Sequence, residues 1–451
     1  MSDTIKISRG YDIRLKGMAE ESIEAAPEAE KVALTPVDCT GISSRNSVEP
    51  GDRVQVGTRL FFDRNDERVA GVSPVSGRVV DIIRGERRVI EAIVVAREGS
   101  QKSELNFSSR DLSSNERDRV LDVLLKSGLF LQLKQRPFDV IPNPDDVPRD
   151  IFVSMFDSSP LAPRTHMLLQ GNEDYFKRGL QVLSTLTKGS VHIGVDGDGQ
   201  LPDVISHMNE IDVHYFRGPH PAGNVGVHIH HVAPVRGRND RVWTCSLQGV
   251  IRIGKLFSTG KLDSTVTVAV TGPAAKNRKY YTTLSGSQIS SFMQAAGDPQ
   301  STRFISGNVL TGRNAGRDGY LGMFDSQVTV IPEPESYELL GWLKPGIFQE
   351  SMSRTFLSRL LPKMSFALDA NRNGSVRAFI ASGIYEKVLP MNIYPVFLMK
   401  SIIVQDIDEM EGLGIYELAE EDVALCEYIC PSKISWQKIL REGIELIQKE
   451  G

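Results

Sequence analysis

Cysteine is scarce in this chain: 451 residues include only four, and only Cys426 and Cys430 lie close together. Four scattered thiols do not make the disulfide framework of a small secreted domain, so a reducing cytoplasm is the expected compartment. Iron–sulfur clusters of the ferredoxin type need four thiolates, and Cys39 and Cys245 are far away in sequence. Four positions apart, Cys426 and Cys430 share one face of a helix, where free cysteines pack as small apolar side chains.

Long apolar runs are also absent. A membrane-spanning helix needs about 18 uninterrupted apolar residues, and the strongest run, residues 394–404, is broken by Lys400 and Ser401. The first residues lack the basic run and apolar core of a secretory signal. We therefore expect a soluble, cytoplasmic protein that docks on a membrane, if it works at one, and does not span it.

An excess of positive charge is missing as well. The net charge is −5 and the isoelectric point is near 6.0, so nothing indicates a nucleic-acid partner. At 451 residues the chain is long enough for about three domains with substantial cores.

Common cofactor signatures are not found. The glycine patterns at residues 194–199 and 221–226 follow expected strands, but they lack the GxGxxG spacing that opens onto a helix in dinucleotide sites. The chain has no phosphate loop and no nucleophile elbow. Four acids do not follow the calcium-loop spacing and are better interpreted as a solvated helix start or an edge facing a partner. They are Asp406, Asp408, Glu409 and Glu411.

Histidine is the residue that stands out, because five of eight lie between residues 212 and 234: His214, His220, His228, His230 and His231. If residues 227–231 form a strand, His228 and His230 share one face, so a metal pair is geometrically possible. A catalytic site needs a third ligand, and the nearby acids are only Asp212 and Asp240. We assign no metal ligand and expect most of these histidines to be satisfied polar core residues.

Residues 1–100 are predicted to form a β-rich module. Residues 48–62 and 73–83 alternate apolar and polar side chains around glycines, which is typical of short paired strands. The pattern resembles the barrel-sandwich hybrid of biotinyl and lipoyl carriers, whose exposed hairpin carries a lysine that takes the cofactor. Here Arg64 follows Asp63 at the comparable turn, and a guanidinium is a poor nucleophile. The module is therefore expected to be an unmodified scaffold.

Residues 101–260 alternate helical and strand patterns, which predicts a Rossmann-like α/β domain. An amphipathic helix is expected at residues 117–130 and another helix at residues 172–187. Residues 150–156 and 190–195 are expected to be buried strands. Because the dinucleotide fingerprint is absent, we expect no nucleotide site in this domain.

The remaining chain is predicted to form two further units. In residues 261–334 we expect a strand, a Gly-Pro turn and a helix-like tail over residues 264–293, then strands over residues 305–313 and 325–333. This order resembles a soluble-ligand-binding β-grasp domain, for which packing or subunit contact is the expected role. Residues 335–451 are expected to be a helical domain. The predicted fold class is thus a multidomain α/β and β protein.

Several ordered motifs along the whole chain resemble one family. They are the opening IKISRGYDIRLKG, FVSMFDSSPLAP from residue 152, HPAG followed by GVHIHH, RVWT with its tryptophan, IGKLFSTGKL and ALCEYICPSK. Together they resemble the NqrA family, the NqrA subunit of the bacterial sodium-translocating NADH:quinone reductase. The number and order of these motifs make the resemblance more specific than any one of them.

The resemblance implies a peripheral subunit on the cytoplasmic face of the bacterial inner membrane. The complex oxidises NADH, reduces a quinone such as ubiquinone and exports sodium, which makes the complex a translocase although the isolated chain is not expected to be catalytic. It implies that FAD, FMN, riboflavin and iron–sulfur centres reside in partner subunits, and that this subunit holds no prosthetic group. This chain would belong to the quinone end, next to a membrane-embedded subunit.

A quinone contact needs apolar surface for the isoprenoid tail and donors for the carbonyl oxygens. Within residues 133–140, Arg136 is a candidate donor, while Pro137 and Phe138 are candidate apolar surface. His220 is a second candidate donor. The structural alternatives are that Arg136 closes a loop and that His220 caps a turn.

Two other functions remain open at this point. The absence of reactive residue sets favours a cofactor-free scaffold or assembly subunit of the same complex, with no direct quinone contact. A histidine-dependent metalloenzyme built around His228 and His230 is the other alternative.

Overall fold

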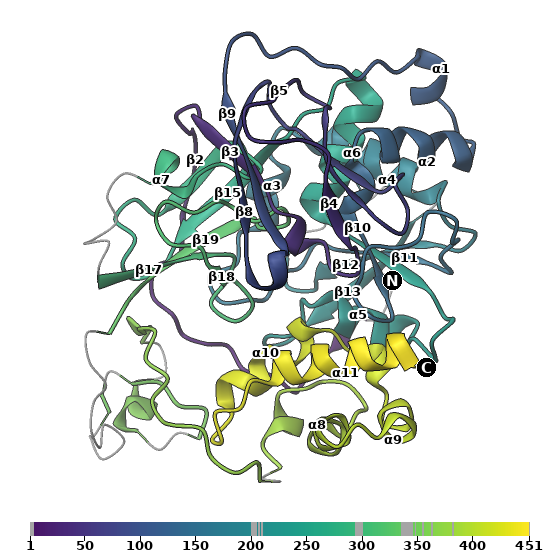
Figure 1. Ribbon diagram of the computed structural model, residues 1–451. Helices are drawn as coiled ribbons and strands as arrows, with labels where there is room; N and C mark the ends of the chain where they lie inside the picture. The colour runs from purple at the N-terminus through teal and green to yellow at the C-terminus, as the bar shows by residue number, and fades with distance from the viewer. Residues whose placement is uncertain are drawn as a thin grey trace.

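The computed structural model describes residues 4–199, 205, 208, 211–293, 301–334, 346–347, 349–353, 356–361, 364–380 and 383–450. Figure 1 shows the β-rich and α/β parts of the chain above the C-terminal helices, with the third sheet (β15–β19, residues 265–332) at the left and the α/β part at the right. Among the residues described, no helix is both long and apolar enough to cross a bilayer.

The N-terminal module consists of two small antiparallel sheets. One has the order β3-β9-β8-β5, and the other has the order β4-β6-β7. The strands are β3 (Lys31–Leu34), β4 (Ser44–Asn46), β5 (Arg53–Val54), β6 (Arg59–Asp63), β7 (Ala70–Val72), β8 (Gly77–Arg84) and β9 (Ile90–Arg97). Leu60, Phe61, Val79 and Ile93 form their shared interior. The paired strands predicted from the alternation are therefore confirmed, and Arg64 lies exposed in the turn after β6.

A six-stranded sheet forms the α/β layer, in the order β1-β13-β12-β11-β14-β10. Its members are β1 (Ile5–Lys6), β10 (Leu133–Arg136), β11 (Ile151–Ser154), β12 (Val191–Asp196), β13 (Ile211–Arg217) and β14 (Val242–Ser246). All neighbours are parallel except β10, which runs antiparallel to β14 at one edge. The predicted strands at residues 150–156 and 190–195 are confirmed as β11 and β12.

Helices cover both faces of this sheet, as its alternating side chains require. The helices of this layer are α1 (Ser109–Leu112), α2 (Arg117–Lys126), α3 (Thr165–Leu169), α4 (Glu173–Ser184), α5 (Val225–Val232) and α6 (Leu247–Thr259). On β12, Val191, Ile193 and Val195 share a core with residues of α4 and α6. Gly194 faces the other side, where a Cβ would lie 2.2 Å from Nδ1 of His228 on α5.

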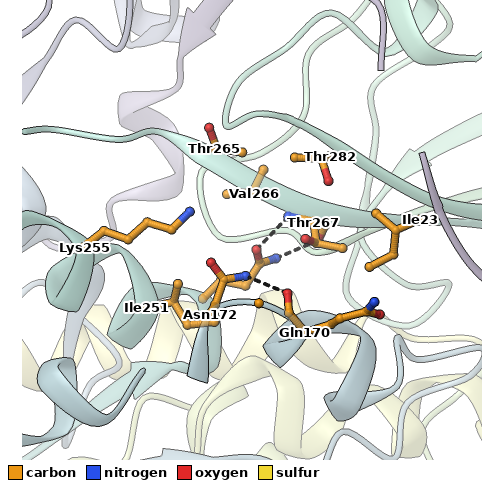
Figure 2. A pocket seen from close by; sticks show the side chains of 11 residues that line it. Ile23, Gln170, Asn172, Ile251, Lys255, Thr265, Val266, Thr267 and Thr282 are labelled. Carbon is orange, nitrogen blue, oxygen red and sulfur yellow. Dashed lines mark hydrogen bonds between the residues drawn. The ribbon is translucent and has the colours of Figure 1, made fainter. Parts of the chain in front are cut away.

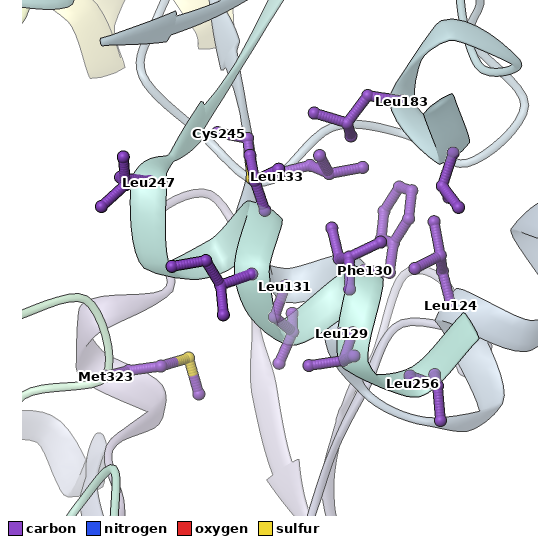
Figure 3. Close-up of a cluster of buried hydrophobic side chains, with 14 of the residues drawn as sticks. Leu124, Leu129, Phe130, Leu131, Leu133, Leu183, Cys245, Leu247, Leu256 and Met323 are labelled. Carbon is purple, nitrogen blue, oxygen red and sulfur yellow. The ribbon is translucent and has the colours of Figure 1, made fainter. Parts of the chain in front are cut away.

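The largest apolar core does not stop at a domain boundary. It runs from the N-terminal module through α2, α4 and α6 to Met323, which precedes the third sheet's strand β19. Figure 3 shows Leu129, Phe130 and Leu131 lying beside α6, with Met323 reaching in from the opposite side. The three units therefore share one interior.

The third sheet has the order β18-β17-β19-β15-β16-β2. Its strands are β2 (Glu20–Ala25), β15 (Thr265–Thr271), β16 (Lys279–Leu284), β17 (Thr302–Ser306), β18 (Arg313–Asn314) and β19 (Gln327–Pro332), with α7 (Ile289–Phe292) beside them. The expected helix-like tail is only α7, because residues 279–284 pair with β15 as the second strand of a hairpin. Strand β2 comes from the N-terminus and joins this sheet through β16.

The C-terminal helices are α8 (Pro395–Ile403), α9 (Ile407–Gly412), α10 (Glu420–Ile429) and α11 (Trp436–Glu450). In Figure 1, α10 and α11 lie between the α/β layer and α8 with α9. The prediction of a helical region from residue 335 is wrong for residues 364–380, which form no helix and carry Asn371, Asn373 and Gly374 in turns. Residues 335–345 lie outside the described residues.

Helices α4 and α6 pack with their backbones in close contact. A Cβ on Gly254 would lie 1.7 Å from the carbonyl oxygen of Tyr175, and a Cβ on Gly179 would lie 2.1 Å from that of Val250. Only glycine fits where one helix backbone meets another this closely.

We predict that Gly254→Ala lowers the free energy of urea unfolding by about 1–3 kcal/mol, because the added methyl forces α4 and α6 apart. Gly237→Ala is the matched control, since a Cβ there meets no atom within 4 Å. Equal unfolding midpoints for the two variants would contradict this account of the helix contact.

Candidate functional site

The candidate site lies where the α/β sheet changes its winding direction. From β11 the chain continues to β12 and β13 on one side, and β14 then returns to the other side of β11. The loops after β11 and β14 therefore diverge at the carboxyl edge, which is where ligands of open α/β sheets bind. A cavity of about 520 Å³ opens at this edge, between Ser154 of β11 and Ser246 of β14.

Every unit of the chain contributes to the cavity wall. Asp38 comes from the N-terminal module, Asp325 from the third unit, and Glu421 from α10. Apolar parts of the wall are Leu168, Val225, Leu247, Leu310 and Phe324. The cavity exists only when all four parts of the chain are assembled.

His220 lines this cavity. Its side chain is buried, with the residue 4% exposed, and Nδ1 lies 3.1 Å from Oγ of Ser158. Oγ also accepts from the N–H of Gly223 at 2.8 Å. A hydroxyl oxygen can accept two hydrogen bonds and donate one, so these contacts are compatible with a proton on either ring nitrogen. Nε2 is buried and has no hydrogen-bond partner among the residues that the structure describes. Burial lowers the pKa of His220 to about 4, so the ring is neutral near pH 7.

Two helices begin at the cavity. Val225 starts α5 and Leu247 starts α6, and both line it. The side chain of Ser246 caps α6 by accepting from the N–H of Gly249 at 3.1 Å. Helix N-termini carry partial positive charge, so they favour a ligand with electron-rich oxygen atoms.

The helix α5 corrects one of the sequence-based interpretations. Residues 227–231, considered above as a strand, are helical. The glycine pattern at residues 221–226 leads into this helix, although it lacks the GxGxxG spacing. The β-branched and histidine residues of this segment have weak helix propensity, which tertiary packing has overridden.

Carboxylates outnumber cations around the cavity. The acids are Asp38, Asp139, Asp157, Asp325, Glu420 and Glu421, while Lys134 and Arg313 are the cations among the described residues that line it. Burial, with Asp38 nearby, raises the pKa of Asp325 to about 6. Burial and the adjacent Asp422 also raise the pKa of Glu421. Such a wall suits a neutral ligand better than a phosphate.

The structure separates the candidate quinone contacts. Arg136 is 1% exposed and forms ion pairs with Asp139 at 3.3 Å, Glu421 at 2.9 Å and Asp422 at 3.0 Å. Pro137 is buried, and Phe138 packs edge-on against Tyr416 with ring centroids 5.7 Å apart. Of the four candidates only His220 lines the cavity. The geometry at Arg136 is that of the alternative in which it closes the turn with Asp139.

Sequence reasoning missed the residues that Arg136 joins. Asp422 is buried on α10, and its carboxylate also accepts from the N–H of Ala419 at 2.9 Å. The acidic start of α10 was visible in the sequence, but its pairing across more than 280 positions was not. The paired charges attach the C-terminal helices to the edge of the α/β sheet.

The remaining clustered histidines contact different elements. His228 stacks on Phe216 with centroids 4.0 Å apart, and its Nε2 donates to the carbonyl of Ala222 at 2.9 Å. Nδ1 of His230 lies 2.7 Å from the carboxylate of Glu417, and His231 bonds the carbonyl of Pro390. His214 bonds His192 on the neighbouring strand at 3.0 Å.

Through these hydrogen bonds and ring contacts, the histidines of residues 212–234 join α5 to the sheet and to the C-terminal region. The shared strand face proposed for His228 and His230 is wrong, because the two side chains bind different partners. In the part of the chain that the structure describes, no group of three His, Cys, Asp or Glu side chains could hold a metal ion.

The C-terminal cysteines have the packing role predicted for them. All four cysteines are buried and free. Cys426 and Cys430 lie in the C-terminal core, where the hydroxyl of Tyr385 is 3.2 Å from Sγ of Cys430.

A second pocket, of about 400 Å³, lies between α6 and the third sheet (Figure 2). Two of its polar side chains are already paired: Gln248 exchanges two hydrogen bonds with the backbone of Thr267, and Lys255 binds Asp263 at 3.1 Å. None of its described lining side chains has a buried atom without a partner. The first cavity is therefore the better candidate.

Comparison with known families assigns the domain types. Residues 5–98 match the NqrA N-terminal barrel-sandwich hybrid domain, residues 115–262 match the NqrA second alpha/beta domain, and residues 267–317 match the NQRA C-terminal domain. The fold class is therefore that of proteins with an N-terminal barrel-sandwich module followed by an α/β domain, as the sequence predicted.

Curated relatives match along the full length. The A subunit of Na(+)-translocating NADH-quinone reductase from Alcanivorax borkumensis is 38% identical over 450 residues, which cover 99% of this chain and 100% of that protein. The proteins of the same name from Neisseria meningitidis serogroup B and Vibrio atlanticus are 37% and 36% identical, with the same coverage. The chain belongs to the NqrA family, the A subunits of Na(+)-translocating NADH-quinone reductases.

Among solved structures, an air-oxidised NAD+-reducing [NiFe]-hydrogenase aligns with a TM-score of 0.38 and 12% identity. It covers 76% of this chain and 63% of its own.

We predict that Arg136→Ala lowers the free energy of unfolding by about 3–5 kcal/mol, because it leaves buried carboxylates unpaired. Arg68→Ala is the control, since Arg68 pairs with Asp66 and Asp145 at the exposed surface and such pairs contribute about 1 kcal/mol or less. Urea unfolding of both variants measures the difference. Similar losses in both would show that Arg136 does not attach α10.

We also predict a pH dependence from His228. Burial lowers its pKa to about 3, whereas an unfolded histidine titrates near about 6.5. Between these two pKa values the unfolded state binds more protons than the folded state. The free energy of unfolding therefore falls as the pH drops below about 6.5, by about 1.4 kcal/mol per pH unit.

His228→Gln removes this contribution, so its plot of unfolding free energy against pH between 4 and 6 should be shallower than that of the wild type. His166→Gln, at an exposed position, should keep the wild-type slope. An unchanged slope in the His228 variant would rule out this contribution.

Proposed function

We propose that this chain is the peripheral subunit that serves the quinone-reduction end of a sodium-translocating NADH:quinone reductase. In this proposal it sits on the cytoplasmic face of the inner membrane, beside a membrane-embedded subunit, and the complex couples quinol formation to sodium export from the cytoplasm. Flavins and iron–sulfur centres belong to partner subunits. The full-length match to proteins named as the A subunits of such complexes supports the complex, and the cavity at His220 supports the quinone end.

The observation that best supports this proposal is that His220, which is neutral near pH 7, lines the cavity. A quinone headgroup is uncharged and planar, and its two carbonyl oxygens accept hydrogen bonds. We place the ring proton of His220 on Nε2, which has no partner among the described residues, so that it donates to one such oxygen. The N-termini of α5 and α6 add partial positive charge that favours the same oxygens. Leu168, Leu247 and Phe324 offer apolar contact for ring substituents and the start of a tail.

The role of this chain would be to bind and orient the headgroup. Reduction of a quinone to a quinol takes two electrons and two protons, and the electrons come from partner subunits. Asp325 has a pKa raised to about 6 and Glu421 has a raised pKa, so both are suited to exchange protons close to neutral pH. His220, whose pKa is about 4, stays a neutral donor.

The scaffold alternative also has an observation in its favour. Arg136, Pro137 and Phe138 are buried within the chain, so they serve its own packing and present no surface to a quinone. In that alternative the cavity stays empty of quinone and the chain only positions its partners.

We predict saturable binding of a short-chain ubiquinone to the folded, isolated protein, followed by tryptophan fluorescence and calorimetry. His220→Ala should weaken binding by up to about tenfold, the value of one hydrogen bond. His166→Ala serves as the control, because His166 is exposed and does not line the cavity.

Two outcomes would argue for the scaffold instead. One is no binding by the folded wild type. The other is equal affinity in the wild type and His220→Ala, which would mean that any quinone binds away from this cavity.

A further inference from the structure

Exposed apolar side chains gather in one part of the molecule. Of the sixteen large apolar residues exposed in the described chain, ten lie between residues 346 and 404. Single exposed apolar residues are ordinary, but a concentration of them marks an interaction surface. The other six are distributed over the first 150 residues.

Helix α8 carries the clearest part of this surface. Its inner face, with Leu398, Met399 and Ile402, is buried in the C-terminal core. Its outer face is apolar too: Phe397 is 60% exposed and Val404, at the C-terminal end, is 72% exposed. A helix that is apolar all round is normally buried on all sides. In Figure 1, α8 lies at the lower edge of the molecule, on the far side of α11 from the sheets.

The exposed side of α8 carries Phe397, Lys400 and Ile403, with Val404 just after the helix, at spacings of three and four residues. Tyr394 is the N-cap residue before the helix and is also exposed. The rings of Tyr394 and Phe397 meet edge-on with centroids 6.3 Å apart. The ammonium group of Lys400 turns aside to lie 5.8 Å from the ring centroid of Phe379.

Acidic side chains are exposed on the neighbouring helix. Helix α9 follows α8 and packs on it, and its exposed acids include Asp408 and Glu409. Asp406 caps α9 by accepting from the N–H of Glu409, and Glu411 accepts from the hydroxyl of Tyr416 at 2.6 Å. Within the described chain, the carboxylates of Asp408 and Glu409 have no hydrogen bond or ion pair. They are therefore available to a cationic partner.

We infer that the outer faces of α8 and α9, the α8–α9 face, bind a cytoplasmic segment of a membrane-embedded partner that is apolar and rich in lysine or arginine. The inference rests on the proposed place of this chain in the complex. Cytoplasmic segments of membrane proteins carry an excess of Lys and Arg, which complements the acids of α9. The anionic headgroups of a bare bilayer would be repelled by the same acids.

The test uses the assembled complex. In Phe397→Asp with Ile403→Asp, the amount of this subunit that co-purifies with the membrane subunits should fall at least tenfold. Asp408→Lys with Glu409→Lys should also reduce it severalfold, and the loss should be larger at low salt, where electrostatic attraction is strongest. Val89→Asp, at an exposed apolar position of the N-terminal module, should leave assembly unchanged.

The isolated variants supply the distinguishing readouts. Quinone binding in isolation should match the wild type, so loss of docking and failure of the proposed quinone site give different results. The charge-reversal pair changes only exposed side chains, so it tests the face even if the apolar variant folds poorly. Wild-type assembly in both pairs would overturn the inference. So would flotation of the wild-type protein with phosphatidylglycerol vesicles that the charge reversal strengthens.

Discussion

The buried guanidinium of Arg136 is the interaction on which the arrangement of this molecule depends. Removing one cation and two or three carboxylates from water is costly, so the group is stable only while Asp139, Glu421 and Asp422 all keep their places. The requirement fixes α10 against the edge strand β10. It thereby places Glu421 in the wall of the cavity, some 285 positions along the chain from Arg136.

The cavity combines features that rarely occur together. A sheet edge of this kind, with two helix N-termini, usually attracts phosphate. Here the surrounding carboxylates oppose a phosphate, and the wall holds a neutral histidine. The cavity therefore has the position of a nucleotide site in the sheet but an acidic wall, which is why we favour an uncharged ligand with carbonyl oxygens.

Much of the fold could be predicted from the sequence, because alternation and helical spacing are local signals. Strands β11 and β12 and helices α2 and α4 follow the predicted segments, and the family resemblance is confirmed. The candidate site could be predicted only in part. His220 was found because its loop is unusual, but burial of Arg136 depends on partners on α10, and the helical state of His228 depends on packing between the sheet and residues 390–417. Neither the burial of Arg136 nor the helical state of His228 is determined by the neighbouring residues in the sequence.

The first 25 residues have a consequence for synthesis of the protein. Strand β1 pairs with β13, where Ile5 lies opposite Phe216, and strand β2 pairs with β16, which begins at Lys279. A ribosome releases both N-terminal strands long before their partners exist. Strand β1 stays unpaired until residues 211–217 have emerged, and β2 stays unpaired until residues 279–284 have emerged, which is more than half of the chain. Such a chain folds late and slowly, and its unpaired strands need protection from other chains during translation.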